Sequence, residues 1–388
     1  MTNDQTKTIG LAMAITIGLN AVIGSGIFGV PAALRLAAGP AGMVTYLLVI
    51  AAILSIALAF ARLASTHPTE QLFYTYTALW AGHLGGVCST LSYTIGLTAA
   101  LGLMATIAGT YLTLFGPFFS AGQWGVILLL LLAFLNALGA AVAKMGQVIL
   151  LVLTLVPMFI IAWLCATNAS WEHLVPFAPA GLGGIFGAIP IVVFGFFGFE
   201  AIPSLVTHIK NPARTVPYAV IATVLITGLV YLLFITAIFA GIPAEFFPAA
   251  STTLPTALLA VFPQYSWLVS LVNWTIIITI AGTIHAMLWS VSNLLVQTST
   301  RLGFCEPISS TLALKLLTTG ACLACMLATN IDFLFGLVAL GVMFAYGLSI
   351  VPLMKKDFIG RHRLLGLCAL ASAGVVIGCA ACTIMGAR

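Results

Sequence analysis

Long apolar segments separated by short polar or turn-forming stretches dominate the chain. Runs long enough to cross a bilayer as helices of about 20 residues lie at 10–35, 40–64, 84–115, 123–143, 147–167, 184–206, 217–240, 265–297, 311–329, 331–353 and 364–386. The pattern predicts an all-α polytopic membrane protein whose eleven helices form a single transmembrane domain over residues 1–388. The boundary between the two helices predicted within 309–353 rests on Asn330 and Asp332, the polar residues that interrupt this apolar stretch.

Two predicted helices, the first and the sixth, are interrupted by glycines that precede a proline. These are Gly24, Gly26 and Gly29 before Pro31, and Gly195 and Gly198 before Pro203. Interruptions at corresponding positions of two halves indicate a transporter built from inverted repeats, with its site near the bilayer midplane. We therefore expect one repeat over about 10–167, a second over about 184–353, and an extra helix over about 364–386. Alternatively, the glycines only permit close helix packing.

Composition and charge support a bilayer environment. Hydrophobic residues make up 62% of the chain and charged residues 5%, against roughly 25% charged in soluble domains. With the N-terminus inside, all lysines and arginines except Arg35 and Arg388 fall on the cytoplasmic side, as the positive-inside rule requires. The net charge of +5 therefore reflects the orientation of the protein in the membrane and does not indicate nucleic-acid binding. We expect a multi-pass protein of the inner (plasma) membrane with an outer C-terminus, and Arg35 reaching the lipid interface.

The break in the first helix has the chemistry of a carboxylate site. An unwound helix in hydrocarbon exposes N–H and C=O groups that cost several kcal/mol each when unpaired, so a break persists where a cavity or ligand satisfies them. The segment Ile23, Ser25, Gly26 and Ile27 begins the outer half-helix. Its free N–H groups and positive dipole end suit a carboxylate.

The break in the sixth helix has the complementary chemistry. Carbonyl groups around Val193, Phe194 and Phe197 end a half-helix and suit an ammonium group. The two breaks together predict a site for an α-amino acid. Glu200 beside the second break is expected to act as a proton or pH switch, because an apolar setting disfavours its ionised form. The alternative is a structural residue that holds the sixth helix.

Other chemistries find little support. No nucleophile is paired with a base and no metal-ligand set appears, so neither an enzyme nor a metal site is expected. The G-x-G-x-x-G spacing over 24–29 follows a long apolar helix rather than a strand and lacks a following acidic residue, so no dinucleotide cofactor is expected. The expected partners are a small amino acid substrate and the lipid bilayer.

Three stretches of the chain carry a family resemblance: "IGSGIFGVP", "AFARLASTHPTEQLFYTYTALWAGHLGG" and "FFGFEAIPSLVTHIKNPARTVPYAV". They resemble segments of the amino acid–polyamine–organocation permeases. The resemblance implies a LeuT-like fold with alternating access and a site between helices 1, 3, 6, 8 and 10. Within that superfamily the chain is most similar to bacterial arginine/agmatine-type exchangers, which implies an aromatic gate at Phe194 and a substrate-stacking tryptophan at Trp289. Thr154 in "VLTLVP" stands where many members carry a lysine.

Two departures from the family pattern limit what the resemblance implies. The segment after helix 2 reads "PTEQL" instead of Pro-x-x-Gly-Gly, and a twelfth helix is missing. The oligomeric state therefore stays open. We expect a secondary amino acid transporter that works by exchange or proton coupling and favours neutral or aliphatic substrates. The alternatives are an arginine or polyamine exchanger and a non-transporting amino acid sensor.

Overall fold

The computed structural model describes residues 9–24, 26–67, 69, 71–116, 118–138, 144–302, 308–327, 331–354 and 361–386. These residues are mainly helical, with one isolated backbone pairing between Ile9 and Ile209. Among them, seven helices are long and apolar enough to cross a membrane, and four apolar helices are shorter. The prediction of an all-α, multi-pass membrane protein is confirmed at this level.

Nine helices of 17 residues or more account for most of the described residues. They are α3 (Gly42–Thr66), α4 (Leu72–Leu112), α5 (Ala121–Ala137), α6 (Lys144–Ala166), α10 (Pro212–Gly241), α12 (Ser266–Leu302), α13 (Ser310–Leu327) and α14 (Ile331–Ile350), with α15 (Arg361–Gly386) following them. The shorter helices are α1 (Leu11–Val22), α2 (Gly26–Ala38), α7 (Gly181–Gly187), α8 (Ile189–Phe194), α9 (Ala201–Ser204) and α11 (Leu254–Val261).

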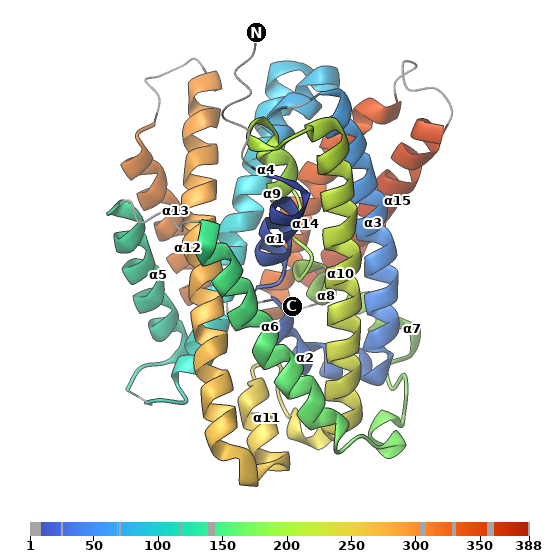
Figure 1. Cartoon of the computed structure of the whole chain (residues 1–388), viewed down its shortest axis with the longest axis vertical. Coiled ribbons are helices and arrows are strands. Elements are labelled where there is room, and N and C mark those ends of the chain that lie inside the picture. The colour runs from blue at the N-terminus through green and yellow to red at the C-terminus, as the bar shows by residue number, and fades with distance from the viewer. Residues whose placement is uncertain are drawn as a thin grey trace.

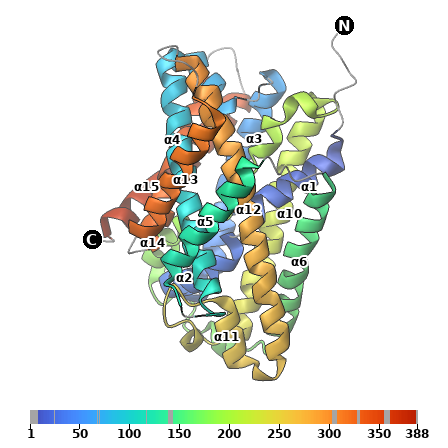
Figure 2. The same cartoon turned by 90° about the vertical axis from the view of Figure 1, so that its left-hand side faces the viewer.

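The long helices run side by side around the short helices α1, α8 and α9, whereas α7 and α11 lie at the edge of the bundle (Figure 1). Helix α10 packs against α3 and α1, and α14 packs against α4 and α15. Figure 2 shows α1 crossing the bundle beside α10 and α6. The ends of α1 and α8 therefore lie in the middle of the molecule, enclosed by α3, α4, α10 and α14.

Both predicted interruptions are present. The first apolar segment ends as α1 at Val22 and resumes as α2 at Gly26. The sixth ends as α8 at Phe194, passes through turns over 195–200, and resumes as α9 at Ala201. Gly198 has a φ of 119°, which side-chain-bearing residues rarely adopt, so glycine is required in this turn.

Local signals set several helix ends. Gly39, with a φ of 61°, stops α2 in the left-handed conformation that glycine favours after a helix. Ser120 begins α5 with a capping box, in which its hydroxyl accepts from the N–H of Gln123 at 3.3 Å and the Gln123 side chain accepts from the Ser120 N–H at 2.8 Å. Pro212 occupies the first position of α10, where its missing N–H costs nothing.

Two placements differ from the sequence predictions. The helix predicted to start at 84 begins at Leu72, and a sharp bend at Gly82 separates its first ten residues from the rest. The prediction missed these residues because they are short and mixed in polarity. Asp332, one of the two polar residues expected to divide the apolar segments within 309–353, lies inside a helix, in the first turn of α14, where the helix dipole favours a carboxylate.

The prediction that Arg35 reaches the lipid interface is wrong. Its side chain is only 6% exposed. The guanidinium donates from Nη1 to the carbonyl of Phe239 at 3.1 Å and from Nη2 to the carbonyl of His173 at 2.6 Å, and it stacks 4.9 Å from the Phe239 ring centroid. Arg35 therefore ties the end of α2 to the end of α10, because unpaired helix-end carbonyls attract a cation.

We expect Arg35→Met to destabilise the protein by about 2–4 kcal/mol, because two charge-assisted hydrogen bonds are lost from a buried site. The measurement is the thermal unfolding midpoint in detergent. Arg214→Met is the matched control, since Arg214 is exposed and lies 6.0 Å from the Tyr218 ring centroid. Equal midpoints for the two variants would show that the Arg35 contacts contribute nothing.

Candidate functional site

The two interrupted segments meet backbone to backbone. A Cβ added at Gly26 would lie 2.8 Å from the Cα of Gly195 and 3.5 Å from the Phe194 ring. A Cβ added at Gly198 would overlap the carbonyl group of Ala21. Because backbone atoms cannot swing aside as side chains do, glycine at these positions allows the breaks to touch. This contact is the close-packing role that glycines have in membrane helices.

Hydroxyl groups from neighbouring helices contact the first break. Tyr231 of α10 donates to the carbonyl of Val22, the last residue of α1, at 2.9 Å. Tyr111 of α4 donates to the carbonyl of Phe28 in α2 at 2.9 Å. A Cβ added at Gly24 would lie 2.7 Å from Oγ1 of Thr283 in α12. The break is therefore held by α4 and α10 and faces α12.

Most predicted binding residues lie in or next to these breaks. The side chains of Ile23, Ile27, Val193, Phe194 and Phe197 are all buried, with exposed fractions of 8% or less. Gly26 is also buried. Ser25 lies outside the described residues. The structure thus brings the predicted residues of helices 1 and 6 together, and their role in substrate binding stays a prediction.

Phe194 packs against Phe335 of α14. Their ring centroids are 5.3 Å apart and the rings are nearly perpendicular, at 74°. Phe335 is fully buried. This edge-to-face pair joins the end of α8 to α14, so a movement of the Phe194 ring, as a gate requires, would have to break this contact.

Glu200 is fastened by three donors. Its side chain is 5% exposed. Oε1 accepts from the hydroxyl of Tyr93 in α4 at 2.6 Å, and Oε2 accepts from the hydroxyl of Tyr346 in α14 at 2.6 Å and from the N–H of Gly198 at 3.0 Å. We call Glu200, Tyr93, Tyr346 and the Gly198 N–H the Glu200 cluster. It joins α4, α14 and the second break through one carboxyl group.

The donors explain how a carboxyl group is accommodated in an apolar interior. An ionised carboxylate accepts hydrogen bonds, and each of the three donors stabilises it without a cation. Sequence reasoning found Glu200 but missed Tyr93 and Tyr346. The available signal was weak, because both tyrosines sit in predicted helices where such residues usually pack. Contacts 107 and 146 residues apart in the chain cannot be read from spacing.

Trp289 is not placed with the other predicted residues. Its side chain is 59% exposed, whereas Leu288 and Val291 on the same helix, α12, are buried. The burial pattern puts the indole on the surface of α12, and its role as a substrate wall stays a prediction. His285, one turn earlier, has its Nδ1 2.7 Å from Nδ2 of Asn136 in α5, which gives it a packing role between helices.

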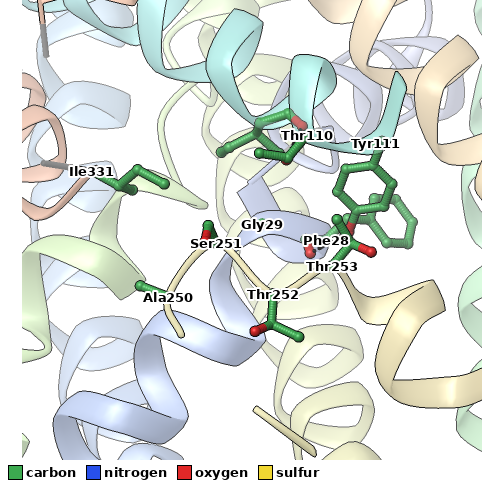
Figure 3. Close-up of a pocket in the computed structure, with 10 residues that line it drawn as sticks. Phe28, Gly29, Thr110, Tyr111, Ala250, Ser251, Thr252, Thr253 and Ile331 are labelled. Carbon is green, nitrogen blue, oxygen red and sulfur yellow. Dashed lines mark hydrogen bonds between the residues drawn. The ribbon is translucent and has the colours of Figure 1, made fainter. Parts of the chain in front are cut away.

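A small, partly open pocket lies beside the other end of the first break. Phe28 and Gly29 of α2, Thr110 and Tyr111 of α4, and the loop before α11 line it. Figure 3 shows Ser251, Thr252 and Thr253 of this loop grouped around α2, with Tyr111 across from them. Its described walls carry hydroxyl groups and apolar side chains.

The sequence profile of the amino acid permease family matches residues 9–386. The chain belongs to this family. The predicted membership of the amino acid–polyamine–organocation superfamily is thereby confirmed. The permease is similar to the branched-chain amino acid permease BcaP of Bacillus subtilis, with 25% identity over 314 residues, which cover 73% of this chain and 65% of the relative.

Two further relatives extend the comparison. The aspartate-proton symporter of Bacillus subtilis is 27% identical over 329 residues, 79% of this permease and 61% of the symporter. The vacuolar cationic amino acid transporter 4 of Arabidopsis thaliana is 28% identical over 262 residues, 61% of this permease and 44% of the relative. The permease thus spans less than two thirds of the length of these relatives.

Proposed function

We propose that this permease is a secondary active amino acid transporter that works by alternating access, through exchange or proton coupling. The observation that carries the proposal is the contact between two interrupted helices at the centre of the bundle, beside a carboxyl group bonded to α4 and α14. The opposite dipole ends of the half-helices at such a contact suit the two charges of a zwitterion. Membership of the amino acid permease family supports the same substrate class.

The proposed architecture is a LeuT-like pair of inverted repeats with eleven spans. Helices α1 to α6 form the first repeat, α8 to α14 the second, and α15 the additional span. Each pair α1/α2 and α8/α9 counts as one interrupted span. With a cytoplasmic N-terminus, α1, α9 and the start of α4 face the inside, and the pocket beside Phe28 faces the outside. The inner membrane is the proposed location.

The proposed substrates are neutral or aliphatic amino acids. The two oxygens of Glu200 already accept three of the about four hydrogen bonds that a carboxylate can accept, so little capacity remains for a cationic side chain. The buried side chains at the breaks, such as Ile27, Val193 and Phe194, are apolar. The relative named for branched-chain amino acids fits this preference. Relatives named for cationic amino acids support the arginine exchanger as the second candidate.

Exchange in proteoliposomes tests the proposal. Vesicles containing the purified permease are preloaded with leucine, valine, arginine or agmatine, and uptake of the same labelled compound is measured. We expect leucine or valine exchange to exceed arginine exchange by at least about tenfold, because an unpaired cation in the membrane interior costs several kcal/mol. Vesicles without internal substrate are the control that separates exchange from net uptake. Equal or faster arginine exchange would favour the second candidate.

A further inference from the structure

The first ten residues of α4, 72–81, form a separate helical segment. Gly82 has a φ of 68° and a ψ of −166°, so the helix bends sharply there before it continues to Leu112. In Figure 1 this light-blue segment lies across the top end of the bundle. We call residues 72–81 the cover segment.

The cover segment lies on the Glu200 cluster. Its buried face carries Phe73 and Tyr76, which are 4% and 0% exposed. The Phe73 ring stacks on Tyr93 with centroids 4.0 Å apart, and on Tyr346 with centroids 5.9 Å apart and an angle of 6°. One side chain of the cover segment therefore spans both tyrosines that hold Glu200. The tyrosines cannot separate while Phe73 stays stacked on both.

Two polar contacts hold the cover segment in place. The indole N–H of Trp80 donates to the carbonyl of Leu348 in α14 at 2.9 Å. Across the bend, the hydroxyl of Tyr74 lies 2.9 Å from Nδ1 of His83. Trp80 is 39% exposed and His83 is exposed too. Contacts at the surface are easily exchanged for water, so they hold the segment without locking it.

The bend has the properties of a hinge. The conformation of Gly82 is populated essentially by glycine alone. Among the described residues, no neighbouring segment lies within 4 Å of a Cβ added at Gly82, so conformation and not space requires glycine there. Gly86 on the next turn lets the segment fold back closely, since a Cβ there would lie 2.8 Å from the ring and the carbonyl oxygen of Tyr74.

We propose that the cover segment is a hinged inner lid that turns about Gly82, and that it must lift before the Glu200 cluster can open and release substrate to the inside. This inference rests on the proposed function for the direction of release. Phe73 links the bent cover segment to the Glu200 cluster. Loosening the bend or breaking the Trp80 contact therefore exposes the residues beneath the cover segment to solvent.

Ser349 provides a reporter beneath the lid. It is fully buried, and its hydroxyl lies 3.5 Å from that of Thr77 on the cover segment. The reporter variant Ser349→Cys is labelled with a maleimide in the full-length, detergent-solubilised permease, and labelling of residue 349 is followed by mass spectrometry. Slow labelling is expected in this background while the lid is closed.

Two second-site variants should open the lid. Trp80→Phe removes the donor to Leu348 and keeps a ring, and Gly82→Ala strains the bend. Each should speed labelling of residue 349 roughly two- to tenfold, the ratio expected from losing one ordinary hydrogen bond or from comparable strain. Gly347→Ala is the matched control, because no other helix in the described part of the chain comes within 4 Å of its added Cβ. Its labelling rate should equal the parent's.

Unfolding is separated from lid opening by the thermal midpoint of each variant. If Gly82→Ala does not fold, Trp80→Phe decides, because it preserves the packed ring. Unchanged labelling in folded Trp80→Phe would overturn the proposal and make the segment a fixed corner. Labelling needs no substrate, so absent exchange together with faster labelling would refute the transport function and leave the lid intact.

Discussion

Replacing Glu200 with alanine is expected to lower amino acid exchange at least tenfold. The substitution leaves the hydroxyls of Tyr93 and Tyr346 and the N–H of Gly198 without their acceptor in a buried site. Each unsatisfied donor costs about 1–3 kcal/mol. Three of them together lower the equilibrium constant for the contact between α4, α14 and the second break by more than about tenfold. Exchange in proteoliposomes, normalised to the amount of inserted protein, measures the effect.

Glutamine at the same position separates hydrogen bonding from charge. Glu200→Gln keeps one carbonyl acceptor and the shape of the protonated acid, so we expect substrate binding to persist. If Glu200 is the proton switch, exchange by Glu200→Gln should depend less on pH than exchange by the parent, because the amide carries no titratable proton. Glu172→Gln, at an exposed carboxylate in the 171–174 turn, should retain the parent's profile.

Overlapping pH profiles for the parent and Glu200→Gln would reduce Glu200 to a structural residue. Full exchange by Glu200→Ala would go further and show that the three hydrogen bonds are not needed for the transport cycle.

Gly198→Ala is expected to abolish exchange and to lower the thermal unfolding midpoint. A φ of 119° strains any residue with a Cβ by about 1–3 kcal/mol. The added Cβ would also overlap the backbone carbonyl of Ala21, and this second effect pushes the two interrupted helices apart. The two effects add at the centre of the proposed site. Exchange and the unfolding midpoint in detergent are the measurements.

Two glycines provide graded controls for this variant. Gly181 has a positive φ of 58° but open space around an added Cβ, so Gly181→Ala should show the strain alone. Gly183 has open space and no positive φ, so Gly183→Ala should behave as the parent. If Gly198→Ala matches Gly183→Ala in both measurements, contact between the breaks is not required for transport.

The mistaken and missing sequence predictions share a physical origin. Arg35 was expected at the lipid interface because it follows an apolar helix, yet carbonyl groups from residues far along the chain bind it in the interior. The role of Trp289 in lining the site, expected from its position in a motif, stays a prediction, and its 59% exposure depends on how α12 is rotated in the bundle. The local sequence shows neither how a helix is rotated in the bundle nor which distant carbonyl groups accept a hydrogen bond.

The linear sequence by itself determined the membrane environment, the helices and the positions of the two breaks. The length of an apolar run predicts a membrane-spanning helix, and a cluster of glycines before a proline predicts where that helix is interrupted. Both signals lie in residues that are neighbours in the chain. Tertiary structure alone decided that the breaks touch, that Tyr93 and Tyr346 bind Glu200, and that residues 72–81 fold over them. These contacts join segments more than a hundred residues apart or depend on a single bend, so packing of the whole bundle is what brings them together.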